Sequence, residues 1–290
     1  MSNFLVVGPS RAAGHNPIAV MGPQLGYYYP EIVFEADVHA PGVLAQGVYV
    51  PGGGPYQLIG RTRNDAWSLT SASNDNRDDF LEQLCNADGS PATRASDHYV
   101  YKRHCIAMTT CDAGRIAGVP GDVTFHRTVH GSVVGTATIE GRPYAIALDR
   151  STYGRDALNL GAMRDMTLGR ASTPRKFFRA AGQFGFTFNW PYVNRHHVAY
   201  FSSGRLPIRA RGTNPMLPTL GTGNDNWRGF LWLARHPHAV DPRGGSGSTG
   251  TTSPPRAGPP ATTCTTAPST GRSSSAASAA ACASRTSSRS

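Results

Sequence analysis

The chain has 290 residues, enough for one or two domains, and a formal net charge of +10 at pH 7. No stretch reaches the ~18 consecutive apolar residues of a membrane-spanning helix, and no basic and apolar leader precedes the first strand. The basic residues are scattered, without a Lys/Arg-rich block or interleaved aromatic residues. We therefore expect neither a nucleic acid nor a membrane as a partner.

The N-terminus combines a serine with a predicted hairpin. Removal of Met1 would leave Ser2 with its hydroxyl and a free α-amine on one residue. An α-amine has a pKa near ~8, so it can take the hydroxyl proton and make Ser2 a nucleophile with its own base. The apolar runs that start at residues 4 and 18 predict two strands that fix this terminus. The alternative is an ordinary serine after an initiator methionine.

Further along the chain, the predicted elements are mostly strands. Residues 2–80 indicate short strands and glycine-rich turns, and residues 98–150 alternate as in an antiparallel sheet. A helix is predicted over residues 173–181, because Thr173 is a good cap and Pro174 suits the first helical position.

The cysteines and histidines indicate neither a zinc site nor a disulfide framework. Cys85, Cys105 and Cys111 lack the CxxC spacing of zinc ligands, although Cys105 and Cys111 could pair across a hairpin in an oxidising compartment. The pairs at 196–197 and 236/238 lack the spacing of a metal-binding helix, so we assign them to the surface or to packing.

Several short motifs follow one another in an order that indicates a family. They are Ser2-Asn3, Gly22-Pro23-Gln24, Trp67 to Thr70, Asp75 to Phe80, Phe188-Asn189-Trp190, Tyr200 to Pro207 and Leu217 to Gly223. Together, over residues 1–240, they resemble the N-terminal part of the β-chain of the penicillin acylase family of N-terminal nucleophile hydrolases. The resemblance implies an α+β fold, a partial αββα sandwich that is mostly antiparallel β.

The same resemblance implies amide hydrolysis through an acyl-enzyme on Ser2. The backbone N–H of Ser71 matches an oxyanion donor, and Gln24 matches a residue that lines the nucleophile's pocket. An ordinary polar turn at Ser71 and a loop hydrogen bond at Gln24 are the alternatives. Leu25 and Ile59 stand where penicillin-G-type members have Phe, which favours an aliphatic or otherwise different acyl chain.

The implied substrate is a linear amide, such as the acyl side chain of a β-lactam. Hydrolysis of acyl-homoserine lactones is the closest alternative, and a catalytically inactive fragment is another. By resemblance, an α-chain from the same precursor is the expected protein partner. The intact precursor is expected in the periplasm or outside the cell.

Calcium is the cofactor that the resemblance implies, in a structural role. Asp75 and Asp78 match its carboxylate ligands, and the carbonyls of Arg77 and Pro218 match two further oxygens. These four form an incomplete set, because calcium takes six to eight oxygen ligands. The alternative for the acidic residues is the solvated start of a helix before Phe80.

Towards the end of the chain the composition is limited mainly to Ser, Thr, Pro, Ala, Gly and Arg, so residues 241–290 are predicted to be a disordered tail. A linker or glycosylated stalk is one interpretation, and a shifted reading frame is the other. With a slip of one base, residues 249–254 permit Asn-Trp-Asn-Asn-Lys-Pro, the segment that follows in the family. The family's second oxyanion donor and another calcium ligand would then fall at Thr251 and Thr262.

Overall fold

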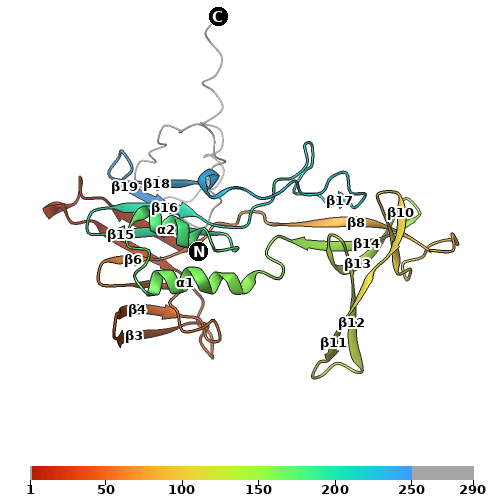
Figure 1. Ribbon diagram of the computed structural model, residues 1–290, viewed down its shortest axis with the longest axis horizontal. Coiled ribbons are helices and arrows are strands. Elements are labelled where there is room, and N and C mark those ends of the chain that lie inside the picture. The colour runs from red at the N-terminus through yellow and green to blue at the C-terminus, as the bar shows by residue number, and fades with distance from the viewer. Residues whose placement is uncertain (1, 250–290) are drawn as a thin grey trace, which may run out of the picture. The chain divides into compact units, whose positions relative to one another are not determined.

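The structure is a computed structural model, and it describes residues 2–249 (Figure 1). These residues form three β-sheets and two α-helices, and every pair of neighbouring strands is antiparallel except β17 and β8. The expected α+β fold with mostly antiparallel strands is confirmed. No helix within residues 2–249 is long and apolar enough to cross a lipid bilayer.

The first sheet holds the N-terminus, in the strand order β19-β1-β2. Its strands are β19 (Ser246–Thr249), β1 (Ser2–Val7) and β2 (Ile18–Pro23), and the 3-10 turn η1 (Ala13–His15) lies between β1 and β2. β1 and β2 pair antiparallel from Ser2 opposite Pro23 to Val7 opposite Ile18, so the predicted hairpin is confirmed.

The second sheet has the order β18-β16-β15-β6-β5-β4-β3, and β7 also pairs with β15. Its strands are β3 (Phe34–Ala40), β4 (Val43–Tyr49), β5 (Ile59–Arg61), β6 (Asp65–Trp67), β7 (Thr70–Ser71), β15 (Phe188–Asn194), β16 (Val198–Ser202) and β18 (His238–Val240).

The third sheet has the order β10-β9-β8-β14-β13-β12-β11, with β17 beside β8. Its strands are β8 (Arg77–Cys85), β9 (His98–Tyr101), β10 (His104–Ala107), β11 (Thr109–Arg115), β12 (Asp122–Thr128), β13 (Gly131–Ile139), β14 (Arg142–Arg150) and β17 (Thr219–Leu220). The alternating pattern of residues 98–150 therefore marks strands, as predicted.

The two α-helices lie between β14 and β15 in the chain. They are α1 (Asn159–Thr167) and α2 (Pro174–Ala181), together with the 3-10 turns η2 (Asp156–Leu158) and η3 (Leu233–Arg235). The Thr173 side chain accepts a hydrogen bond from the backbone N–H of Lys176, and Pro174 opens α2. The helix predicted over residues 173–181 is confirmed.

β15 and β16 separate two apolar layers, because alternate residues of a strand point to opposite faces. Ala199 and Phe201 of β16 join the core that α1 and α2 cover, whereas Val198 and Tyr200 pack with the β1–β2 hairpin. Figure 1 shows α1 and α2 beside β15, β16 and β6. Residues 2–249 thus supply a helix layer and two sheet layers, three of the four layers of an αββα sandwich.

The acidic segment before Phe80 forms a strand, so its interpretation as a helix start is wrong. In β8 the buried residues are Asp78, Phe80, Glu82 and Leu84, with more exposed residues between them. This period of two is that of a strand with one buried face, and pairing with β14 fixes it. The preference of acidic residues for a helix start is weaker than this tertiary pairing.

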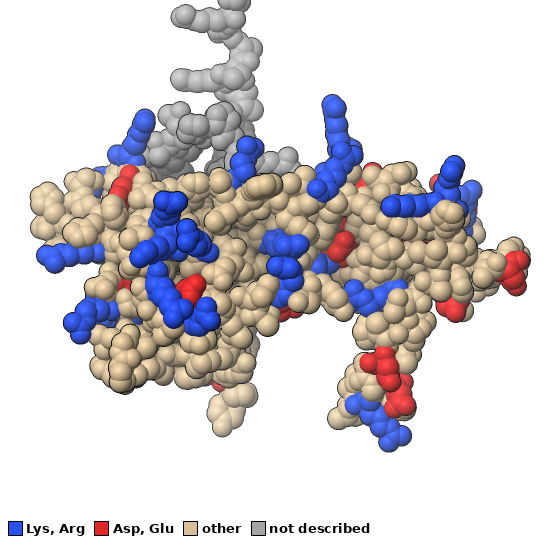
Figure 2. Space-filling model, viewed as in Figure 1, with Lys and Arg blue, Asp and Glu red and all other residues tan. Residues whose placement is uncertain are grey.

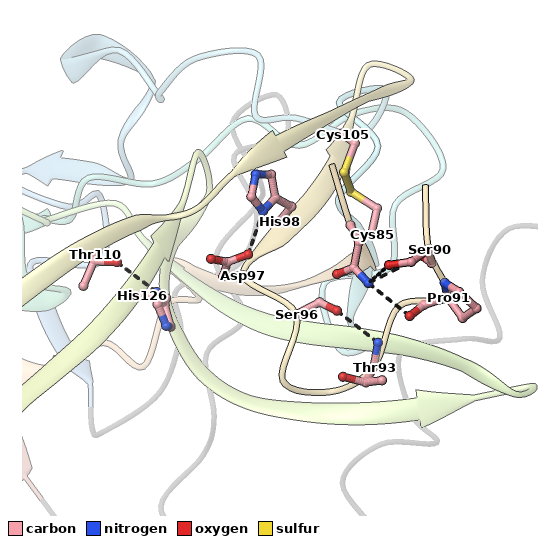
Figure 3. A network of polar contacts seen from close by, with 11 residues as sticks. Cys85, Ser90, Pro91, Thr93, Ser96, Asp97, His98, Cys105, Thr110 and His126 are labelled. Atoms are coloured by element: carbon pink, nitrogen blue, oxygen red, sulfur yellow. Dashed lines mark hydrogen bonds and ion pairs between the residues drawn. A yellow bond between two sulfur atoms is a disulfide. The ribbon is translucent and has the colours of Figure 1, made fainter. Parts of the chain in front are cut away.

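A disulfide joins Cys85 to Cys105, and Cys111 is free, so the possible Cys105–Cys111 pair does not form. Figure 3 shows this bond close to the hydrogen bonds of the loop that connects β8 and β9. β9 pairs with both β8 and β10, which brings the two Cα atoms to 6.0 Å. Cys111 instead lies in β11 opposite Phe125 of β12.

The ordered part of the chain continues past the expected boundary at residue 240. β19 pairs antiparallel with β1, and Val7 lies opposite Ser246. Residues 246–249 are therefore a strand and not part of a disordered tail. Residues 250–290 of the predicted tail, including Thr251, Thr262 and the possible frame shift, lie outside the described residues.

Candidate active site

Ser2 is the first residue of β1, a strand of the first sheet. The residue is only 8% exposed, and β2 holds it in register opposite Pro23. Phe4, two residues along the same strand face, packs its ring 6.1 Å from the ring of Tyr200 in β16. The side chain of Ser2 therefore faces the interior between the two sheets, as a site closed to bulk water requires.

Ser71 lies in β7, which neighbours β1. Ser71 is opposite Phe188 of β15. The backbone of Phe188 does not bond to Ser71 but to Ser203, because the Phe188 N–H donates to Ser203 Oγ and the Phe188 carbonyl accepts from the Ser203 N–H. The neighbouring Ala72 N–H donates to the carbonyl of Thr187 at 3.0 Å. Successive residues of a strand alternate between these two positions. The Ser71 N–H consequently points away from β15.

Asn189 and Tyr200 connect this region by side-chain hydrogen bonds. Asn189 is fully buried, and its Nδ2 donates to the carbonyl of Ser71 at 3.5 Å. The Tyr200 hydroxyl donates to Asn189 Oδ1 at 2.7 Å, and burial raises the pKa of Tyr200 to about 12. Tyr200 is thus a neutral donor at pH 7. The pair ties β7, β15 and β16 together under β1.

Gln24 follows directly after the residue that pairs with Ser2, so its backbone is close to the N-terminus. Its side chain is exposed. Leu25 is also exposed, at 47%, whereas Ile59 packs against the core that α1 and α2 cover. The role of Gln24 in the pocket, like that of Leu25 and Ile59 in acyl preference, stays a prediction.

The four residues expected to hold calcium meet at one cavity of about 510 Å³, which Asp75, Arg77, Asp78 and Pro218 line together. Both carboxylates, however, bind Arg209. Its Nε lies 2.8 Å from Asp78 Oδ2, and its Nη2 lies 2.9 Å from Asp78 Oδ1 and 2.8 Å from Asp75 Oδ2. The indole N–H of Trp227 also donates to Asp78 Oδ2, at 2.6 Å.

This arrangement does not fit a calcium ion. Within residues 2–249 no group of three or more His, Cys, Asp or Glu side chains is placed to hold a metal, and the two expected carboxylates already bind a guanidinium. Asp149 lies opposite Asp78 on β14, and burial together with the charge of Asp78 raises the pKa of Asp149 to about 6. Arg209 is the counter-ion of Asp75 and Asp78 at this site.

Replacing Arg209 with glutamine should lower the free energy of unfolding by about 2–3 kcal/mol, because Asp78 is 7% exposed and would lose its charged partner. Urea unfolding at pH 7 measures this, and Arg211→Gln, at an exposed position two residues along, is the matched control. EDTA should leave the wild-type unfolding midpoint unchanged. A midpoint that falls in EDTA and is restored by calcium would contradict this account.

The sequence motifs do not reveal the side-chain partners of the site. Asn189 and Tyr200 belong to motifs that indicate the family, but those motifs give the two side chains no role. Arg209 lies two residues after the end of the Tyr200-to-Pro207 motif and belongs to none of the motifs. A signal did exist for Arg209, because a buried carboxylate such as that of Asp78 requires a partner that compensates its charge.

Comparisons with known proteins show which family the chain resembles. The sequence pattern of the penicillin amidase family matches residues 1–281. The penicillin G acylase of Escherichia coli is 27% identical over 256 residues, which are 87% of this chain and 29% of that protein. The acyl-homoserine lactone acylase QuiP of Pseudomonas syringae pv. syringae is 29% identical over 211 residues, which are 72% of this chain and 24% of that protein.

A solved structure shows the same fold. The thermostable penicillin G acylase from Alcaligenes faecalis superposes with a TM-score of 0.74 at 24% sequence identity, covering 86% of this chain and 43% of that chain. The present chain spans less than a third of the length of the two curated relatives. With a family pattern that covers nearly all of its residues, the chain belongs to the penicillin amidase family.

Proposed function

We propose that this chain carries the nucleophile of an amidohydrolase that cleaves a linear acyl amide, with Ser2 as its N-terminal residue after removal of Met1. One observation carries the proposal. Ser2 is buried at the head of a strand that lies against β7, the strand whose Ser71 N–H points away from its own sheet partner. A nucleophile and an oxyanion donor therefore belong to adjacent strands.

The reaction proceeds in two steps. Ser2 Oγ attacks the amide carbonyl while its proton passes to the α-amine, directly or through one water, and the tetrahedral intermediate expels the amine with that proton. Water then attacks the acyl ester and releases the acid. The Ser71 N–H donates to the oxyanion in both steps, and removal of one such donor typically costs ~100 to 1,000-fold in rate.

The substrate is the acyl side chain of a β-lactam or a related amide. The alternative is an acyl-homoserine lactone, which the QuiP acylases hydrolyse according to their name. The aliphatic residues Leu25 and Ile59 favour the alternative, because they leave room for a flexible alkyl chain where aromatic rings would select a ring.

An α-chain from the same precursor is the protein partner in this proposal. The chain matches 30% of the penicillin acylase 2 proenzyme of a Pseudomonas species, and the name of that protein describes a precursor. The periplasm or the extracellular space is the proposed location. The Cys85–Cys105 disulfide supports this, because such bonds persist in oxidising compartments.

The test uses the 290-residue chain, with mass spectrometry to confirm that Ser2 is the terminus. Hydrolysis of chromogenic phenylacetyl and long-chain acyl amides is measured for the wild type and for Ser2→Ala, with Ser10→Ala, an exposed serine, as the matched control. We expect turnover that only Ser2→Ala abolishes. A folded wild-type chain without turnover would contradict the proposal and support an inactive fragment.

A further inference from the structure

A second cavity, of about 420 Å³, lies where the chain segments around η2, the end of α2 and η3 meet. Its lining includes two arginines, Arg155 and Arg205, together with apolar side chains such as Phe184, Phe230 and Leu231. Neither Ser2 nor Ser71 lines this cavity, and neither does Arg209 or the two carboxylates that it binds. The cavity is therefore separate from the candidate active site.

The guanidinium of Arg205 is fixed but not neutralised. It stacks on the ring of Phe230, with its central carbon 3.5 Å from the ring centroid. Stacking holds the plane of the group and leaves its N–H donors directed sideways. Arg205 Nε is buried and has no acceptor among the described residues. A buried donor of this kind is costly unless a partner accepts from it.

The neighbouring acidic side chains do not neutralise these donors. No acidic side chain in residues 2–249 pairs with Arg155 or Arg205, and Asp156, next to Arg155, is engaged by Arg150 at 3.0 Å. Burial and the charge of Arg155 lower the pKa of Arg205. Thr152, which also lines the cavity, is 1% exposed and its hydroxyl has no partner among the described residues.

The surroundings add positive charge. Figure 2 shows many more Lys and Arg than Asp and Glu side chains over the face that carries α1 and α2. These helices contain Arg164, Arg175, Lys176 and Arg179, against Asp165 as their only acidic residue. An anion would gain from this field as well as from direct contacts.

We propose that this cavity binds a small carboxylate with an apolar tail. The carboxylate would accept hydrogen bonds from the guanidinium groups of Arg205 and Arg155 and from the Thr152 hydroxyl, because the fork of an arginine matches the two oxygens of a carboxylate. The tail would lie against Phe184 and Leu231. Phosphate fits less well, because it offers nothing to the apolar wall.

The experiment measures binding of hexanoate to the full chain by isothermal titration calorimetry, beside hexanol, acetate and inorganic phosphate. We expect hexanoate to bind, and the three other probes to bind about tenfold more weakly or worse, since each lacks the charge, the tail or both oxygens in the right geometry. Equal binding of phosphate or acetate would overturn the assignment of an apolar tail. No binding of hexanoate would overturn the site.

Variants locate the binding. Arg155→Gln and Arg205→Gln should each weaken hexanoate binding about tenfold or more, because each removes a charge-assisted hydrogen bond. Arg205→Gln also removes the stacking on Phe230 and can disturb the fold for that reason. Arg155 is exposed, so Arg155→Gln tests the site without that effect. Arg142→Gln, exposed at the start of β14, carries the same charge change and should bind as the wild type. Unchanged affinity in Arg155→Gln would contradict the proposal, whatever the catalytic activity of the chain.

Discussion

Replacing His130 with leucine is expected to lower the free energy of unfolding by about 3–5 kcal/mol, because it leaves Glu82 buried without its charged partner. His130 Nδ1 lies 2.6 Å from Glu82 Oε1, and the two side chains are 4% and 0% exposed. The other ring nitrogen, Nε2, lies 2.9 Å from Asn226 Oδ1, and Asn226 in turn donates to the hydroxyl of Tyr101. Both ring nitrogens thus face acceptors, which only the protonated imidazole can satisfy.

This pair makes stability depend on pH. Burial disfavours the protonated ring, but the hydrogen bonds to Glu82 and Asn226 and the charge of Glu82 outweigh burial and raise the pKa of His130. The native state therefore holds this proton more tightly than the unfolded state. The stabilisation is fully present below the unfolded pKa of ~6.5 and is lost as pH rises through the higher native pKa.

Urea unfolding at pH 6 and pH 8.5 checks both statements. The double variant Glu82→Leu/His130→Leu is the control, because replacing both members of a buried pair with apolar groups is often nearly neutral. We expect the double variant to recover most of the loss and to weaken the pH dependence. A loss below about 1 kcal/mol in His130→Leu would show that the pair is not buried as described.

Replacing Phe177 with alanine should also cost about 3–5 kcal/mol, the usual range for removing a fully buried aromatic side chain. Phe177 is 0% exposed in α2, and its ring stacks on Tyr192 of β15 at 4.6 Å between centroids. The cavity left behind would lie between the helix layer and the second sheet. Lys176→Ala, the preceding and exposed position of the same helix, should change stability by less than about 0.5 kcal/mol.

Thermal and urea unfolding of the two α2 variants measures the difference. If Phe177→Ala were no less stable than Lys176→Ala, α2 would not cover β15 in solution. The same experiment tests the layer order on which the position of Ser2 depends, because β1 packs on the opposite face of β15 and β16.

Local patterns could be predicted from the sequence where neighbouring residues decide the structure. Thr173 and Pro174 predict the start of α2 because a cap acts on the backbone three residues away. The two apolar runs predict the β1–β2 hairpin because these strands are neighbours in the chain. The ordered motifs identify the family. The acidic residues before Phe80 favour a helix start locally, but pairing with β14 places them in a strand.

The sequence by itself therefore determined the family, the nucleophile candidate Ser2 and the mainly antiparallel fold. The tertiary structure alone decided which groups become partners. Arg209 and Asp78 are 131 residues apart, and Glu82 and His130 are 48 apart, so no local pattern links them. The disulfide choice between Cys85 and Cys111 likewise depends on strand order. Burial and charge pairing are properties of positions in space, and the chain reaches them only when the sheets have formed.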